Sequence, residues 1–321
     1  MNALARRLTL GCCALTIASL ASAPALAADQ FINVLTGGTS GVYYPLGVAL
    51  ASGIGKAMPG VKTSVQSTKA SVENLNLLQA GRGEIAFTLG DALSDAWKGN
   101  EDAGFKTPLK KLRGIAAIYP NYIQIVARAD SGIKTLADLK GKSISVGAPK
   151  SGTELNARAV LAAAGLTYKD FSKVEYLPFG ESVELMKNRQ IDVTLQSAGL
   201  GVSALRDLAT SVDIVVVPIP AEVIKKINDP AYLPAVIPAN TYRGQTADVP
   251  AAAVQNYLVT YDGLSNDIVY AMTKAFWGDL PQLVAAHSAA KAIELKHALD
   301  GMPVPLHPGA EKYYKEVGII K

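Results

Sequence analysis

The sequence predicts an α/β protein made of two lobes with a ligand cleft between them. About half of the 321 residues are hydrophobic (49%) and only 18% are charged, which leaves enough apolar surface to build large cores. The length is typical of two domains. Short apolar strands alternate with helices, a pattern typical of parallel sheets with crossover helices. We therefore expect two lobes of this kind.

The first alternating block opens the mature chain and is expected to start the first lobe. A glycine-rich turn at 37–41 follows its first strand, and Pro59-Gly60 ends its first helix. The expected strands are 31–36, 61–66 and 85–89, and the expected helices are 42–57 and 71–80.

The second block repeats this pattern. Ser40-Gly41 and Ser151-Gly152 each follow a strand and begin a helix, and 85–90 resembles 191–196. Strands are expected at 115–127 (interrupted at Tyr119-Pro120-Asn121), 144–146, 174–177, 191–195 and 213–217, and helices at 136–139, 153–164, 181–188 and 200–209.

The C-terminal part is expected to return to the first lobe. Residues 218–250 are rich in proline, and 233–242 is the expected second crossing strand. Residues 254–260 are expected to form another strand, and 265–321 to be helical. The expected division is therefore 29–120 and 241–321 in lobe 1 and 121–240 in lobe 2, joined by two crossing strands.

Residues 1–28 are typical of a secretory signal peptide. Arg6 and Arg7 precede an apolar run at 8–20, and Ala25-Leu26-Ala27 suits signal cleavage. The run is too short for a spanning helix, so we expect a periplasmic protein without a transmembrane segment. Cys12 and Cys13 both lie in this leader, so the mature chain has no disulfide. Lipidation of Cys12 is the weaker alternative, because Thr9-Leu10-Gly11 is a poor lipobox.

Charge excludes nucleic acid as an expected partner. Removal of the leader lowers the Lys and Arg count from 31 to 29 against 27 acidic residues, so the mature chain is almost neutral. A nucleic-acid-binding surface needs clustered basic residues.

The two Ser-Gly turns are the main candidate ligand site. Ligands of open parallel sheets bind beyond the carboxyl ends of the strands, and a helix start offers unpaired N–H groups to an anion. Ordinary helix capping by Ser and Thr explains either turn alone, whereas the matched pair favours binding. The candidate residues in these turns are Gly38, Thr39, Ser40, Tyr43, Ser151, Gly152 and Thr153.

Other polar residues follow the remaining strands. Lys69 would neutralise a carboxylate or simply be solvated, and Asp91 would hold an ammonium or cap a helix. Gln196 and Ser197 would donate to a carboxylate or have a capping role. Tyr119 and Tyr122 are further candidates to line the cleft. The additional site residues expected at these strand ends are Ser67, Thr68, Lys69, Asn74, Gly90, Asp91, Gln196 and Ser197.

Motifs for catalysis fail on inspection, so neither catalytic residues nor a cofactor nor a metal ion is expected. The three histidines lie near the C-terminus without metal-binding spacing. Gly199-x-Gly201-x-x-Ala204 is the best dinucleotide-like motif, but the acidic residue expected about 20 positions later is missing.

The turn sequence resembles a family of transport receptors. The stretch 37–47, GGTSGVYYPLG, is similar to the opening signature of TAXI-type solute-binding proteins, the extracytoplasmic receptors of certain TRAP transporters. Ser67-Thr68, Gly152-Thr153 and 307–314 are similar to later blocks of that family, and 89–91 and 196–199 depart from it. The resemblance spans essentially the whole mature chain.

This resemblance implies a type II periplasmic-binding-protein fold that closes around a small ligand. It implies a monomeric receptor that delivers a dicarboxylate, 2-oxoglutarate-like or glutamate-like acid to TRAP membrane permease subunits. Two alternatives stay open. One is a periplasmic sensor for a two-component kinase, and the other is an exported enzyme.

Overall fold

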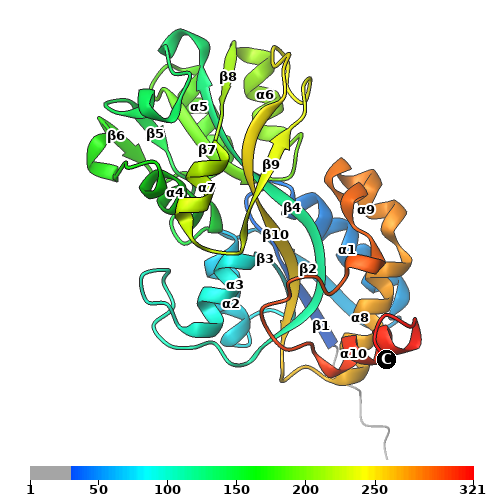
Figure 1. Cartoon of the computed structure of the whole chain (residues 1–321). Coiled ribbons are helices and arrows are strands. Elements are labelled where there is room, and N and C mark those ends of the chain that lie inside the picture. Colours follow the sequence, from blue (N-terminus) through cyan, green and yellow to red (C-terminus); the bar gives the residue numbers. More distant parts are fainter. Residues whose placement is uncertain (1–29) are drawn as a thin grey trace, which may run out of the picture.

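The computed structural model describes residues 30–321, so the signal peptide expected at 1–28 lies outside the described residues. Two α/β lobes stand one above the other (Figure 1). The expected fold class is confirmed. Within the described range, no helix has the length and apolar character needed to cross a membrane.

The first lobe is built on three parallel strands in the order β2-β1-β3. All five residues of β3 are buried, as expected for a central parallel strand, whereas β2 at the edge alternates between half-buried and exposed positions. The elements are β1 (Gln30–Leu35), α1 (Tyr43–Ala57), β2 (Val61–Gln66), α2 (Ser71–Gln79), β3 (Ile85–Leu89) and α3 (Gly90–Lys98).

The second lobe repeats this arrangement with parallel strands in the order β7-β5-β6. Two further strands, β8 and β9, each pair with one of two long strands that also run through the first lobe. The elements are β5 (Ser143–Ser145), α4 (Gly152–Ala163), β6 (Lys173–Glu175), α5 (Phe179–Lys187), β7 (Val193–Ala198), α6 (Ser203–Ser211), β8 (Ile214–Val217), α7 (Ala221–Ile227) and β9 (Tyr232–Ile237). The expected helix 136–139 is a short 3₁₀ turn, η2 (Leu136–Leu139).

Two long antiparallel strands, β4 (Leu112–Arg128) and β10 (Val249–Tyr261), run through both lobes (Figure 1). The expected interruption of the first crossing strand is wrong, because β4 continues through Pro120, which lies opposite Gln255. The second crossing strand expected at 233–242 is also wrong. That segment contains β9, which folds back on β10, and β10 itself makes the return to the first lobe.

The C-terminal helices pack on the first lobe, as expected. They are α8 (Asn266–Gly278), α9 (Leu280–Ala286) and α10 (Pro308–Glu316), and α8 packs against α1. Trp277 on α8 donates a hydrogen bond of 3.0 Å to the Tyr314 hydroxyl, which donates one of 2.8 Å to the Ile115 carbonyl of β4. This chain of bonds fixes the C-terminal helices to the crossing strand.

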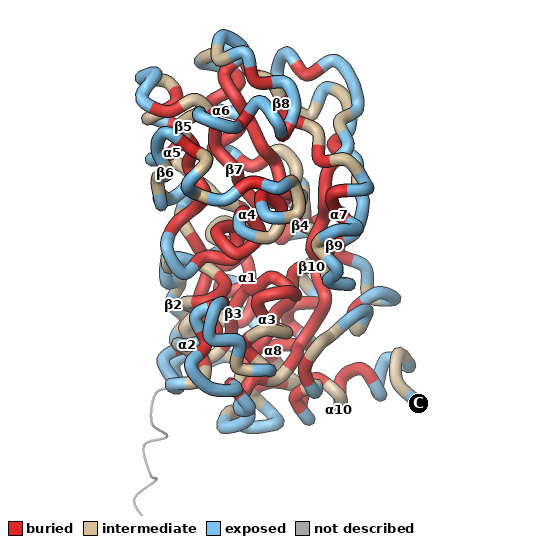
Figure 2. The backbone as a smooth tube through the Cα atoms, turned by 60° about the vertical axis from the view of Figure 1, so that its left-hand side comes forward, coloured by how far each residue is buried: buried red, intermediate tan, exposed pale blue. Residues whose placement is uncertain are grey.

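The core forms two clusters of buried hydrophobic residues, and each contains residues of both lobes. One cluster joins α1 and α8 of the first lobe with α5 and α6 of the second, and the other joins α2 and α3 with α4 and α7. Buried chain runs along β4 and β10 from one lobe to the other (Figure 2). The crossing strands therefore connect the two lobes through packed side chains as well as through the backbone.

Candidate ligand-binding cleft

The first glycine turn connects β1 to α1. Gly41 N–H donates to the Gly38 carbonyl at 3.0 Å, and Val42 occupies the N-cap position of α1. Valine offers no side-chain acceptor, and within the described residues no side chain caps this helix. The first amides of α1 therefore remain available to an acceptor in the cleft.

The second turn connects β5 to α4. Gly147 adopts φ +93°, and a Cβ there would lie 2.7 Å from Thr153 Cγ2, so this corner requires glycine. The Ser151 hydroxyl accepts the Glu154 N–H at 3.1 Å, so Ser151 caps α4. The capping alternative for this serine is thus correct, and its hydroxyl hydrogen stays available to another acceptor.

A third helix start, that of α2, adjoins these turns. Ala70 has φ 69° and ψ −145°, a backbone conformation that only glycine adopts easily. Thr68 Oγ1 accepts the Ala70 N–H at 2.9 Å, and Lys69 N–H donates to Glu73 Oε2 at 2.6 Å. These bonds hold the strained residue in place. Backbone strain of this kind concentrates at functional sites.

A hydrogen-bonded chain of four residues connects the lobes where the crossing strands β4 and β10 pass between them. The Tyr43 hydroxyl of α1 donates to Asn256 Oδ1, and Asn256 Nδ2 donates to Asn121 Oδ1 at 2.8 Å. Asn121 Nδ2 then donates to the Ser197 carbonyl at 2.9 Å. Burial raises the pKa of Tyr43 far above its usual value, so this hydroxyl remains a neutral donor.

A cavity of about 650 Å³, counting its open mouth, lies where the three helix starts and this chain meet. Most of this space is open to solvent at the mouth, so the volume alone does not fix the size of a ligand. It is lined by Gly37, Gly38, Gly41, Val42, Tyr43, Thr68, Lys69, Ala70, Ser71, Leu89, Tyr119, Asn121, Ala148, Ser151, Gly152, Thr153, Pro178, Phe179, Ser197 and Ala198. Both glycine turns therefore face one cleft.

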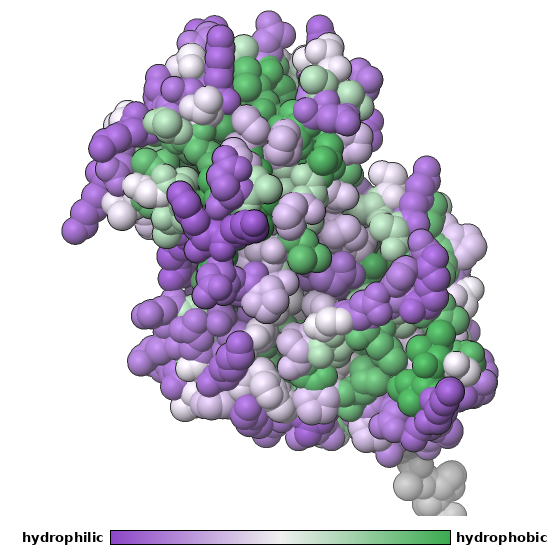
Figure 3. Space-filling model, viewed as in Figure 1, coloured by the Kyte–Doolittle hydropathy of each residue, from purple (hydrophilic) through white to green (hydrophobic). Residues whose placement is uncertain are grey.

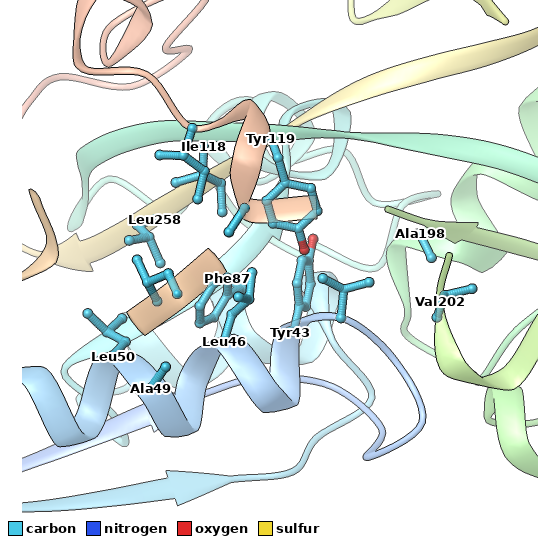
Figure 4. Packing of buried hydrophobic residues seen from close by; sticks show 14 of the residues in the cluster. Tyr43, Leu46, Ala49, Leu50, Phe87, Ile118, Tyr119, Ala198, Val202 and Leu258 are labelled. Carbon is cyan, nitrogen blue, oxygen red and sulfur yellow. The ribbon is translucent and has the colours of Figure 1, made fainter. Parts of the chain in front are cut away.

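Two hydroxyls at this cavity lack protein partners. Tyr119 Oη and Ser197 Oγ are buried and have no hydrogen-bond partner among residues 30–321. The rings of Tyr43 and Tyr119 point their hydroxyls toward one another, with Ala198 of the second lobe facing them (Figure 4). A buried hydroxyl without a partner is costly, and a native structure normally provides one.

The two lobes touch around the cavity. Ser203 Oγ and Ala204 N–H of α6 donate to the Ser40 carbonyl at 2.8 and 3.4 Å. On another side of the cleft, Glu73 N–H donates to the Lys150 carbonyl at 3.2 Å. The outline of the molecule narrows between the lobes, where hydrophilic and hydrophobic residues mix (Figure 3). The lobes are thus held together by hydrogen bonds on two sides of the cleft.

A second polar cluster between the lobes lies outside the cavity. Asp91 Oδ2 of α3 accepts bonds from Asn156 Nδ2 of α4 at 2.6 Å and from the Tyr232 hydroxyl of β9 at 2.7 Å. Ala92 N–H donates to its other oxygen at 2.8 Å. Burial raises the pKa of Asp91 to about 6, although the Tyr232 hydroxyl lowers it, and the carboxylates of Asp229 and Asp95 raise it further.

The residues expected from the sequence divide into two groups. The structure brings eight of them to the cavity wall: Gly38, Tyr43, Thr68, Lys69, Ser151, Gly152, Thr153 and Ser197. Tyr119 also lines it, whereas Tyr122 does not. Whether any of them binds a ligand stays a prediction.

Seven expected residues do not line the cavity: Thr39, Ser40, Ser67, Asn74, Gly90, Asp91 and Gln196. The Asp91 carboxylate faces Asn156 and Tyr232, and the N-cap of α3 is Leu89, so Asp91 does not cap that helix. Asn74 is fully buried and donates to the Thr36 and Phe87 carbonyls, and Gln196 is fully buried. Gly90 packs on Tyr257, Ser67 Oγ bonds the Gly37 carbonyl, Thr39 is exposed, and Ser40 contributes its carbonyl to α6.

Sequence reasoning missed the apolar part of the wall. Pro178 and Phe179 begin α5 of the second lobe, and a Cβ on Gly41 would lie 3.8 Å from the Phe179 ring. Asn121 and Asn256 were also missed. Their signal was a polar residue inside a long apolar strand, which is uncommon unless its hydrogen bonds are satisfied.

Solved structures of transport proteins share this fold. The methylphosphonate complex of PhnD1 from Prochlorococcus marinus superposes with a TM-score of 0.57 at 12% identity, covering 91% of this chain and 100% of that one. A structure described as a periplasmic transporter gives 0.57 at 13% identity, covering 91% and 94%. A putative L-cystine ABC transporter protein from Listeria monocytogenes gives 0.50 at 16%, covering 84% and 98%. At these identities the likeness establishes the fold alone.

The sequence itself carries a family match. The model of the NMT1-like family matches residues 34–318, from β1 to the end of the C-terminal helices. Since this match covers nearly the whole described chain, the protein belongs to the NMT1-like family.

Proposed function

We propose that this protein is a periplasmic solute-binding receptor, which captures a small organic acid between its lobes and delivers it to a membrane permease. The observation that carries the proposal is the cavity itself. It lies between two lobes that share hydrogen bonds, and the polar groups still available on its wall are mainly donors.

Two hydroxyls on the wall favour an acceptor-rich ligand. Thr153 Oγ1 accepts the Ser197 N–H at 3.4 Å. Ser151 Oγ accepts the Glu154 N–H in the same way. Because a hydroxyl that accepts a backbone N–H keeps its own hydrogen, each can donate to a carboxylate.

The helix starts supply positive potential in the same place. The amino end of a helix carries about half a positive charge, and α1, α2, α4 and α5 all begin with residues on the cavity wall. Lys69 adds an ammonium group at an exposed position of the wall. A carboxylate is therefore favoured in this cleft over a neutral or cationic group.

Closure follows from ligand contacts with both lobes. A ligand that bonds Lys69 of the first lobe and Ser151 of the second binds the closed form more tightly than an open form, so it shifts the population toward closure. The surface formed by the two closed lobes is what the permease would recognise. On the motif at 37–47, we propose a TAXI-type TRAP permease as the partner.

A thermal-shift panel tests the receptor function. The protein is heated with organic acids of about four to six carbons, with aliphatic sulfonates, phosphonates and amino acids, and without addition; a ligand at 100 times its Kd adds about 2.7 kcal/mol to stability. We expect at least one carboxylic acid to raise the melting temperature. If no acid does so, the proposed function is refuted. Uptake of the best acid into vesicles that contain the candidate permease then tests the partner.

A further inference from the structure

The cavity wall carries a single charged side chain among the described residues. Lys69 is that residue, and its side chain is exposed. Arginine, aspartate and glutamate do not occur on the wall as far as the structure describes it. One end of a ligand can therefore meet a full cation, while the other positions meet only uncharged groups and the partial charges of the helix starts.

Two buried residues of the cavity wall carry polar groups without charge. Tyr119 is 1% exposed and Ser197 is 5% exposed, and neither hydroxyl has a partner in residues 30–321. Burial holds the pKa of Tyr119 well above its usual value, so the phenol remains neutral. Two neutral hydroxyls can pair with a ketone, a hydroxyl or an amide of a ligand.

A second carboxylate would lack a full opposite charge beside Tyr119 and Ser197. It would meet only the partial positive charge of the α4 start, where Thr153 Oγ1 accepts the Ser197 N–H, because Lys69 is the one charged residue of the described wall. An ammonium group would lack a carboxylate, since Asp91 already accepts bonds from Asn156, Tyr232 and Ala92. Dicarboxylates and amino acids are therefore both disfavoured.

Apolar residues supply the rest of the wall. Val42, Leu89, Ala148, Pro178, Phe179 and Ala198 come from both lobes. They suit a short hydrocarbon segment between the two polar ends of a ligand.

We infer that the ligand is a small monocarboxylate whose far end carries an uncharged polar group. The carboxylate lies near the helix starts and Lys69, and the keto, hydroxyl or amide group bonds Tyr119 and Ser197. This inference rests on the proposed receptor function and narrows its ligand class.

Calorimetry with size-matched acids tests the charge rule. Succinate, levulinate and succinamate have the same number of non-hydrogen atoms, but only succinate has two carboxylates. Glutarate and 5-oxohexanoate extend the comparison by one methylene, and 4-aminobutyrate adds a zwitterion. We expect levulinate or succinamate to bind at least tenfold more tightly than succinate and 4-aminobutyrate, which corresponds to about 1.4 kcal/mol.

The outcomes separate this inference from the proposed function. If succinate or 4-aminobutyrate binds as tightly as levulinate and succinamate, or glutarate as tightly as 5-oxohexanoate, the ligand class is overturned while the receptor function stands. If none of these acids binds and the thermal-shift panel is also negative, both are overturned.

Tyr119→Phe and Ser197→Ala test where the neutral end lies. Pentanoate lacks the keto oxygen of levulinate, so the ratio of the two affinities reports on that oxygen alone. We expect the preference for levulinate over pentanoate to fall at least threefold in each variant. Tyr122→Phe, on the same strand but off the cavity wall, is the matched control and should keep the wild-type ratio. An unchanged ratio in both test variants would contradict the inference.

Discussion

Two sets of buried polar side chains lie between the lobes, and they differ in how far the protein satisfies their hydrogen bonds. Around Asp91, the carboxylate receives three hydrogen bonds from α4, β9 and its own helix. Around Tyr119 and Ser197, two hydroxyls at the cavity have no partner within the described chain. The protein satisfies the Asp91 carboxylate itself, although Asn156 Oδ1 in the same cluster has no partner among the described residues, whereas the two cavity hydroxyls are left for a ligand to satisfy.

This difference indicates where binding energy enters. A satisfied cluster contributes the same interactions before and after a ligand arrives, as long as the lobes stay closed. An unsatisfied hydroxyl contributes a desolvation cost that a ligand removes. Selectivity should therefore depend on the cavity hydroxyls, and the strength of closure should depend on Asp91 and its neighbours.

The largest effect is expected from filling a tight contact between the lobes at Gly152. A Cβ on Gly152 would lie 2.6 Å from both Leu89 Cδ1 and Ser71 Oγ of the other lobe. Gly152→Ala should therefore resist closure without unfolding either lobe, and ligand affinity measured by calorimetry should fall at least tenfold, about 1.4 kcal/mol. Gly38→Ala is the control, because its Cβ would lie 4.0 Å from Pro178. Equal losses in both variants would contradict this account.

The pH dependence of stability isolates Asp91. Its pKa is raised from 3.8 to about 6 by burial, so the folded state binds a proton more tightly than the unfolded chain. The stability that protonated Asp91 adds to the folded state is therefore fully present below pH 3.8 and is lost as the pH rises through about 6. The free energy of unfolding falls by up to about 3 kcal/mol over this range. In urea unfolding, wild type should lose stability relative to Asp91→Asn between pH 4.5 and 7.5. A difference between the two proteins that does not change with pH would exclude this role.

Two tyrosine substitutions compare the clusters directly. Tyr232→Phe removes a donor from the Asp91 carboxylate and should lower the free energy of unfolding by about 1–2 kcal/mol. Tyr119→Phe removes a hydroxyl that has no partner in the described residues, so stability without ligand should change by less than about 0.5 kcal/mol or rise. Urea titration of both proteins checks this, and a larger loss for Tyr119→Phe would reverse the comparison.

The smallest effect is expected at Lys69. Its side chain is exposed, so solvent and salt screen its attraction for a carboxylate. Lys69→Gln should weaken acid binding about two- to fivefold at low salt and less at high salt. A loss that does not depend on salt would mean that Lys69 contacts the ligand in a desolvated position.

The sequence predicted the repeated strand-turn-helix pattern well, because apolar strands and glycine turns are local signals. The two Ser-Gly turns were predicted from these signals, and residues of both turns line the cavity. The strand expected at 254–260 is the second half of β10, but its first half and its crossing role were missed. That half consists of small residues after a proline-rich segment, and the pairing of β10 with β9 and β4 is long-range. Pro120 suggested a break, but the strand passes through it opposite Gln255.

Individual site residues were harder to predict than the turns that carry them. Polar residues at strand ends look alike in sequence, yet Thr153 lines the cavity while Asp91 and Asn74 face the interior. Which way such a residue faces depends on packing between helices and on the neighbouring lobe, which local patterns do not encode. Phe179 gave no signal because apolar residues are usually core.

A crystal structure with the best acid of the panel tests the central claim most directly. The account predicts that the acid lies between the two glycine turns, with its neutral end within hydrogen-bond distance of Tyr119 Oη or Ser197 Oγ. An acid bound outside this cavity, or bound inside it while both hydroxyls stay without a partner, would contradict the account.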